Sequence, residues 1–389
     1  MILFYQLIKL RANINLPRVF CLYILTAMDE EKIFANALNQ DLHIGAASLK
    51  KIKQYFGSFK NGWKAGFSEL KNATGSRELT EFRKNIDPEK EFKELENDKI
   101  KILFPEKFPA LLKEIADPPQ ILYIKGRLPN TDPPDNEAGK THLAVVGTRK
   151  FSSYGKEVCE KLINELRNYD VVIVSGLALG IDAIAHKSAI ANQMRTIGVL
   201  GSGLHENVLY PRANLRLANE IIEKSGCLIS EYAYRAKAAQ FTFPQRNRIA
   251  AGLSEGTLII EAPERSGAMI TAFLALEYNR EVFSVPGGIF NINSGGTNNL
   301  LKMGALPVTN VDDILHALGI EPGSIKEKIK LSPVEEKIIA LLYEPLERDE
   351  LIRKTNLSPK EINPLLSQME IKGIIKEITG KIYPAERGK

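Results

Sequence analysis

The fold is decided by two segments, Leu143-Ala144-Val145-Val146-Gly147-Thr148-Arg149-Lys150 and Val171-Val172-Ile173-Val174-Ser175-Gly176. Each begins with a continuous apolar run and ends in a turn that carries glycine. Continuous apolar runs are typical of strands that are buried on both faces of a parallel sheet. Ligands of such sheets bind beyond the carboxyl ends of the strands, so both turns are candidates for ligand contact.

Further apolar runs repeat this pattern along the chain. They lie at residues 197–200, 228–229, 258–260, 282–285 and 306–308, and segments with helical patterning separate them. Strands that alternate with helices predict an α/β fold, a doubly wound and mostly parallel Rossmann-like sheet. We place this domain at residues 99–320.

The region before the predicted sheet reads as a small helical module over residues 28–75, followed by a polar linker over residues 76–98. Residues 43–52 resemble the turn and second helix of a helix-hairpin-helix (SAM-like) unit. Residues 1–27 precede Met28, and we interpret them as a non-native or disordered extension.

The region after the sheet begins with a Lys-rich linker at residues 321–331 and continues as three short helices and a β-wing over residues 332–389. Ser358 and Glu361 form the pattern of a capping box before the third helix. This arrangement predicts a winged-helix domain. Duplex DNA and a protein partner both fit such a domain.

Composition sets broad limits on function. The chain has 389 residues, with 52 Lys and Arg against 47 Asp and Glu, a net charge of +5 that is compatible with nucleic acid. Its three cysteines form no CxxC pair, which favours a cytoplasmic protein without a thiolate metal site. No stretch reaches the ~20 apolar residues that a membrane-spanning helix needs.

Several strand-to-helix turns are suited to binding phosphate. Glycine allows a close backbone approach, and a helix start supplies free N–H groups. The turns with such residues are Gly147-Thr148-Arg149-Lys150, Ser175-Gly176, Gly203 with Arg212, and Ser266-Gly267. So many turns at one sheet edge favour a polymer over a small phosphate ligand.

Aromatic and basic residues interleave at Phe241-Thr242-Phe243-Pro244-Gln245-Arg246-Asn247-Arg248. Aromatic rings that stack on bases beside arginines are what binding of single-stranded nucleic acid requires. Arg246 and Arg248 cannot share one helical face, so we expect at most one to point at the ligand and the other to pair with a carboxylate.

Catalytic and cofactor motifs are weak in comparison. Ser175, Asp182 and His186 lie close in sequence, but no GxSxG elbow is present. The turns do not form GxGxxG, and the five histidines are scattered, so the sequence predicts no cofactor and no metal.

Together these motifs resemble the DNA-processing protein A family, DprA or Smf. The resemblance covers the Rossmann-like region almost end to end. Its motifs are Val146-Gly147-Thr148-Arg149, Ser175-Gly176-Leu177-Ala178, Tyr210-Pro211, Ser230-Glu231-Tyr232, Arg246-Asn247-Arg248-Ile249 and Val285-Pro286-Gly287.

The resemblance implies a non-enzymatic homodimer that binds single-stranded DNA and loads the RecA recombinase onto it during natural transformation. It implies that Gly147, Thr148 and Arg149 grip the DNA backbone and that Arg212 adds charge. It also implies that Phe241 or Phe243 stacks on a base and that Arg246 or Arg248 supports the site. The dimer and recombinase surfaces are expected on the elements around residues 253–283.

Two alternatives remain open from the sequence. One is a nucleotide phosphoribohydrolase of the lysine-decarboxylase-like type that uses Pro286-Gly287-Gly288 and Glu261 or Glu277, although the contiguous PGGxGTxxE motif is absent. The other is a duplex-DNA regulator acting through the winged helix, for which deletion of residues 331–389 would abolish binding.

Overall fold

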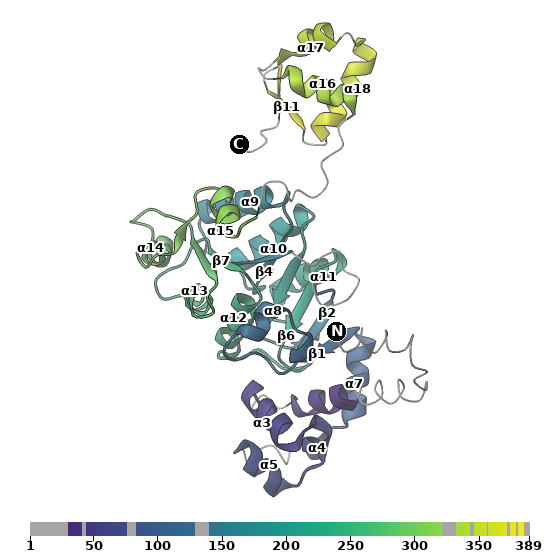
Figure 1. Ribbon diagram of the computed structural model, residues 1–389, viewed down its shortest axis with the longest axis vertical. Helices are drawn as coiled ribbons and strands as arrows, with labels where there is room; N and C mark the ends of the chain where they lie inside the picture. Colours follow the sequence, from purple (N-terminus) through teal and green to yellow (C-terminus); the bar gives the residue numbers. More distant parts are fainter. Residues whose placement is uncertain are drawn as a thin grey trace, which may run out of the picture. The chain divides into compact units, whose positions relative to one another are not determined.

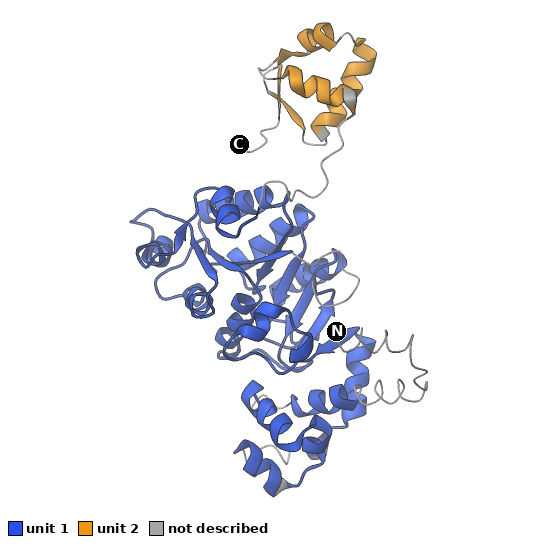
Figure 2. Cartoon of the chain, in the orientation of Figure 1, with its two compact units in different colours: residues 1–324 blue, residues 325–389 orange. Residues whose placement is uncertain are grey.

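The computed structural model describes residues 30–40, 44–75, 83–128, 140–320, 332–342, 346–355, 357–371, 374–378 and 380–384. The chain divides into two compact units, residues 1–324 and residues 325–389 (Figure 2). The whole of the proposed 1–27 extension, the hairpin residue His43 and the proposed 321–331 linker lie outside the described residues. Within the described residues, no helix combines the length and the apolar character that crossing a membrane requires.

The first unit is built on a nine-stranded sheet in the order β1-β2-β6-β5-β4-β3-β7-β8-β9. Seven strands are parallel, and they correspond to the seven predicted apolar runs. These strands are β3 (Thr141–Val146), β4 (Val171–Ser175), β5 (Thr196–Val199), β6 (Cys227–Ser230), β7 (Gly256–Ile259), β8 (Glu281–Ser284) and β9 (Leu306–Pro307). β1 (Ile100–Leu103) and β2 (Leu122–Gly126) extend the sheet antiparallel from β6. The predicted mostly parallel α/β sheet is confirmed.

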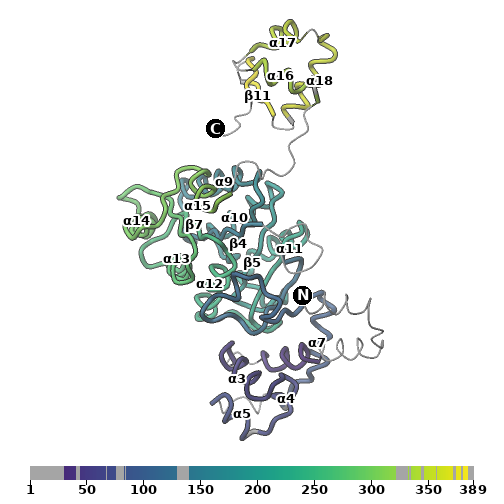
Figure 3. Tube along the Cα trace, viewed as in Figure 1, coloured from purple at the N-terminus to yellow at the C-terminus, as the bar shows by residue number. Residues whose placement is uncertain are grey.

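Helices cover both faces of this sheet (Figure 1). One face packs against α9 (Ser153–Leu166), α10 (Ile181–Ala191), α11 (Leu215–Glu223) and α15 (Val311–Ala317). The other packs against α8 (Ala110–Glu114), α12 (Thr242–Gly252), α13 (Gly267–Glu277) and α14 (Gly295–Lys302). Alternate residues of β4, such as Ile173 and Val174, enter the cores on opposite faces, which explains its continuous apolar sequence. β4 and β5 lie in the middle of the sheet (Figure 3).

The N-terminal helices share a core with the edge of the sheet. They are residues 30–38, α3 (Ala46–Phe56), α4 (Phe59–Lys64), α5 (Phe67–Thr74) and α7 (Pro88–Asn97). Leu38 and Ile52 belong to the same buried cluster as Tyr123 of β2. The Tyr123 hydroxyl donates to Asn36 Oδ1 at 2.9 Å and accepts from the Asn39 amide at 3.3 Å. These helices are therefore packed onto the sheet.

The second unit is a winged helix, as the sequence predicted. Its helices are α16 (Pro333–Leu341), α17 (Arg348–Thr355) and α18 (Pro359–Ile371). Its strands β10 (Leu346–Glu347), β12 (Lys381–Pro384) and β11 (Ile375–Ile378) pair antiparallel in that order. The Glu361 carboxylate accepts from both the backbone N–H and the hydroxyl of Ser358, at 2.9 and 2.7 Å, which fixes the start of α18.

Candidate nucleic-acid interface

The turn after β3 is held by its backbone. A Cβ at Gly147 would overlap Ile181, and the Thr148 N–H donates to the Glu261 carbonyl at 2.7 Å. The Thr148 hydroxyl accepts from the Lys150 N–H at 3.1 Å. These contacts use the main chain of the turn and the Thr148 hydroxyl, and they leave the Arg149 side chain exposed. The turn therefore projects a guanidinium at the carboxyl edge of the sheet.

Arg149 lies over one aromatic ring, which in turn packs against a second. Its guanidinium carbon is 5.7 Å from the centroid of the Phe243 ring, and the Tyr210 and Phe243 centroids are 5.4 Å apart. Tyr210 is 47% exposed, and the Tyr210-Pro211 peptide bond is cis. Among the described residues, no carboxylate forms an ion pair with Arg149. We call Arg149, Tyr210 and Phe243 the Arg149 platform. It combines an uncompensated cation with stacking surfaces.

The turn after β4 packs against the turn after β3. The Ser175 hydroxyl donates to the Val145 carbonyl at 2.6 Å, and the Gly176 N–H donates to the Asp182 carboxylate at 3.1 Å. Gly180 has φ of +85°, and a Cβ there would overlap the Thr148 carbonyl and Arg149 Cα. Only glycine fits this contact, so the second turn sets the position of the first.

Arg246 is buried beneath these turns. Its guanidinium donates to the carbonyls of Gly176 and Val199 and lies near Asp182. Burial lowers the pKa of Arg246, and the Asp182 carboxylate opposes that shift. Arg246 supports the Gly176 turn from inside the protein.

Arg248 points to a different side of α12. It forms a buried ion pair with Glu231, in line with the expectation that one arginine of this motif pairs with a carboxylate. Burial raises the pKa of Glu231, and the neighbouring Arg248 guanidinium opposes the shift. Phe241, at the start of the same helix, is 51% exposed.

Comparisons with known proteins decide the family. A family model described as "DNA recombination-mediator protein A" matches residues 99–319, and one described as "DprA winged helix domain" matches residues 326–381. The chain belongs to the DNA recombination-mediator protein A family. The sequence resemblance to DprA is thereby confirmed.

Relatives of known sequence or structure agree. Protein Smf of Synechocystis sp. is 32% identical over 399 residues, which cover 91% of this chain and 99% of that protein. DNA processing protein DprA of Bacillus subtilis is 41% identical over 211 residues, covering 54% of this chain and 68% of that protein. The X-ray structure of DprA from Streptococcus pneumoniae has a TM-score of 0.60 at 33% identity and covers 74% of this chain and 97% of that chain.

The remaining predicted site residues of this DprA-family chain divide by exposure. Lys150 and Arg212 are exposed, and Arg212 donates to the Glu206 carbonyl at 2.7 Å. Gly203 is buried, and a Cβ there would overlap the Ala233 and Tyr234 carbonyls. Gly203 therefore allows the backbone at Ala233 and Tyr234 to approach closely, whereas the space beside Gly176 is filled by the Arg246 guanidinium.

The start of α13 is exposed at Gly267, whereas the Ser266 hydroxyl beside it is buried. Gly267 is exposed with nothing within 4 Å of a Cβ, and its carbonyl accepts from the Asn247 amide at 3.3 Å. The Ser266 hydroxyl has no hydrogen-bond partner. The contact through Asn247 links this helix start to α12 and hence to the Arg149 platform.

The start of α9, which follows the Gly147–Lys150 turn, is occupied by a carboxylate of the protein itself. Ser152 donates from its N–H and its hydroxyl to the two carboxylate oxygens of Glu261, at 2.9 and 2.6 Å. The Ser152 hydroxyl in turn accepts from the Gly155 N–H at 3.2 Å. A buried internal carboxylate already occupies this helix start, so an added phosphate would meet like charge there.

Two residues of the site were missed by sequence reasoning. Tyr210 had a usable signal, because an aromatic residue precedes Pro211 at the turn that carries Arg212. Asn214 had no local sequence signal, because its partners are far away in the chain. Its amide donates to the Leu177 and Ala178 carbonyls, at 2.9 and 3.1 Å, across 37 and 36 residues of sequence.

Proposed function

We propose that this protein is a cytoplasmic, non-enzymatic recombination mediator that binds single-stranded DNA at the carboxyl edge of its sheet. The observation that carries the proposal is the Arg149 platform, in which a guanidinium outside any described ion pair lies over the half-buried Phe243, whose ring packs against the exposed Tyr210. A cation for phosphate beside rings for bases suits an unpaired strand, because duplex bases are already stacked on one another.

The predicted site residues take two roles in this proposal. Direct contact belongs to the exposed groups: Arg149 and Lys150 after β3, Arg212, the aromatic rings, and the backbone at Ser266-Gly267. Support belongs to the buried ones. The turns are held in place by Gly147, Thr148, Ser175, Gly176, Gly203 and Arg246.

We further propose a homodimer and RecA loading in natural transformation. The surface that supports this extends from α13 to the loop before α14. Ile270, Phe273 and Leu276 are 41 to 44% exposed on α13, and Phe290 in the loop is 96% exposed. Exposed apolar side chains gathered in one region are typical of protein-binding surfaces. The domain limits suggested by the sequence remain part of this proposal.

The phosphoribohydrolase alternative has weaker support. Glu261 is 1% exposed and its two oxygens bind Ser152, while Glu277 ends α13 at the edge of the sheet opposite the carboxyl ends of the strands. Neither of these two carboxylates contacts the Arg149 platform, so neither is a candidate general acid or base beside it.

The experiment is fluorescence anisotropy with a labelled oligonucleotide, single-stranded and then duplex, across a salt series. The proposal expects tighter and salt-sensitive binding of the single strand. A nucleoside monophosphate serves as competitor and as a possible substrate. Cleavage of the monophosphate, or equal affinity for duplex and single strand, would contradict the proposal.

A further inference from the structure

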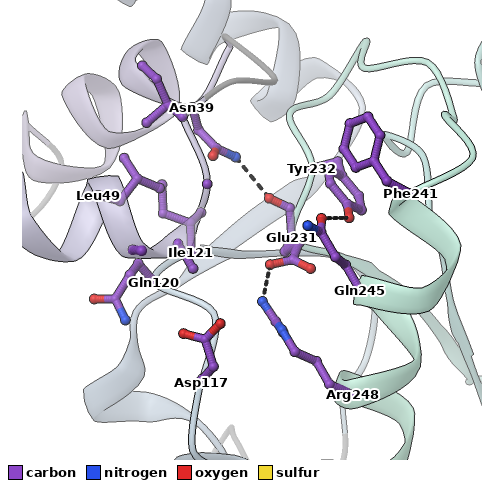
Figure 4. Close-up of a pocket in the computed structure, with 14 residues that line it drawn as sticks. Asn39, Leu49, Asp117, Gln120, Ile121, Glu231, Tyr232, Phe241, Gln245 and Arg248 are labelled. Atoms are coloured by element: carbon purple, nitrogen blue, oxygen red, sulfur yellow. Dashed lines mark hydrogen bonds and ion pairs between the residues drawn. The ribbon is translucent and has the colours of Figure 1, made fainter. Parts of the chain in front are cut away.

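A pocket lies on the side of α12 away from the Arg149 platform, between that helix and α3. It has a volume of about 290 Å³, and Figure 4 shows the residues that line it. Asn39 and Leu49 lie on the side of the N-terminal helices; Tyr232, Phe241, Gln245 and Arg248 lie on the other. A pocket at the lower end of the range for small-molecule sites suits a fragment of nucleobase size.

Helical spacing explains why α12 serves two sites. Phe241, Gln245 and Arg248 are spaced i, i+4 and i+7, so they share one face. Phe243 and Arg246, spaced i and i+3, share another, which faces the sheet edge. Each face thus carries one aromatic ring and one arginine. The pocket repeats the composition of the Arg149 platform on the opposite side of the same helix.

The polar groups of the pocket are incompletely bonded. Arg248 Nη2 pairs with Glu231 Oε2, but Arg248 Nη1 and Glu231 Oε1 are buried without any hydrogen-bond partner. Buried polar atoms are nearly always bonded, so an ion pair that leaves one donor and one acceptor unpartnered points to a ligand that supplies both partners. The Tyr232 hydroxyl contacts Gln245 Oε1 at 3.0 Å at the rim.

We propose that this pocket binds one unpaired base of the single-stranded DNA, with guanine preferred. The 51% exposed Phe241 offers a ring for stacking. Guanine presents two N–H donors and a carbonyl acceptor on one edge, which complements a carboxylate beside a guanidinium. This base specificity rests on the proposed binding of single-stranded DNA and deepens it.

The charges of the pocket disfavour a phosphate as its occupant. The carboxylates of Asp117 and Glu231 both line it, and the single lining guanidinium, Arg248, is already paired. A neutral ligand that both donates and accepts avoids the repulsion that a phosphate would meet. We expect the phosphates of the DNA strand to contact Arg149, which lies at the face of α12 that carries Phe243.

The test measures affinity by anisotropy for an oligo-dT strand and for the same strand with one central guanine. We expect the guanine to tighten Kd about 5-fold or more, the factor expected for one good bidentate base contact. Phe241→Ala and Ala47→Trp should each bring that ratio close to one. Both positions are exposed at the rim, and Ala47→Trp fills the pocket without removing any existing group.

Tyr55→Ala is the matched control, since Tyr55 is an exposed aromatic residue on α3 outside the pocket, and it should preserve the ratio. Thermal unfolding checks that each variant is folded. Tight binding of oligo-dT with a ratio of one in the unaltered protein would overturn the pocket and leave the proposed function standing. An unchanged ratio of the two Kd values in both Phe241→Ala and Ala47→Trp would also overturn the pocket and leave the proposed function standing. Failure to bind any single strand would overturn both proposals.

Discussion

Arg149 is the residue on which DNA affinity depends most directly. Its guanidinium is exposed, and the described part of the chain offers it no carboxylate partner. Arg149→Ala should weaken binding of single-stranded DNA about 10-fold for all sequences alike, because a phosphate contact carries no base information. The slope of log K against log salt should fall by about 0.7.

The matched control is Arg216→Ala, which removes the same charge from an exposed side chain paired with Glu220 on α11. It should change neither affinity nor slope at the same salt concentrations. Equal losses in the two variants would show that net charge, and not the Arg149 platform, governs binding.

Arg246 is expected to affect the stability of the folded protein, whereas Arg149 is expected to affect the affinity for single-stranded DNA. Arg246→Met leaves the Gly176 and Val199 carbonyls without their donor and Asp182 without its nearest cation. Each buried acceptor left without its donor costs about 1–3 kcal/mol, so the urea midpoint should fall sharply. An unchanged midpoint would mean that the buried guanidinium is dispensable, and Arg216→Ala again serves as the surface control.

At the scale of elements, the contact between the two turns is the feature to test. Gly180→Ala places a Cβ against the Thr148 carbonyl at a φ that only glycine adopts readily. It should cost about 1–3 kcal/mol of stability and displace Arg149. The effects of Gly180→Ala and Arg149→Ala on DNA affinity should therefore be less than additive. Gly304→Ala is the control, with φ of +99° and open space around it; it should strain the backbone without changing affinity.

How far these elements could be predicted depends on how local their causes are. The parallel strands were predictable, because burial on both faces leaves a continuous apolar run. β1 was missed because it alternates, with Lys101 exposed at the sheet edge. Arg149 could be found from its turn, whereas the partners of Arg246 lie 70 and 47 residues away in sequence, where no local pattern reaches.

At the scale of the whole molecule, two buried histidines couple folding to pH. Burial lowers the pKa of His142 to about 4 and that of His186 to about 3. An unfolded histidine has a pKa of about 6.5, so below that pH the unfolded chain binds protons that the folded chain excludes. Stability is full above about pH 6.5 and falls by up to ~1.4 kcal/mol per histidine and pH unit below it.

Urea unfolding at pH 7.5, 6.5 and 5.5 measures this slope. His142→Leu should make it shallower, whereas His316→Gln, which replaces an exposed histidine on α15, should leave it unchanged. A slope that is the same in all three proteins would assign the pH dependence to other groups.

The two compact units allow the sites of DNA binding to be separated. All residues of the Arg149 platform belong to the first unit, and deletion of residues 331–389 leaves that unit whole. The winged helix offers little positive charge. On α18, Lys360 is offset by Glu361 and Glu370, and on α17 Arg348 is paired with Glu377.

Deletion of residues 331–389 should therefore weaken binding of single-stranded DNA less than about 3-fold, well below the effect of one lost phosphate contact. Adding Arg149→Ala to the shortened chain should then reproduce the loss seen in the full chain. Loss of all binding on deletion alone would instead move the DNA site to the winged helix and favour a duplex-DNA regulator.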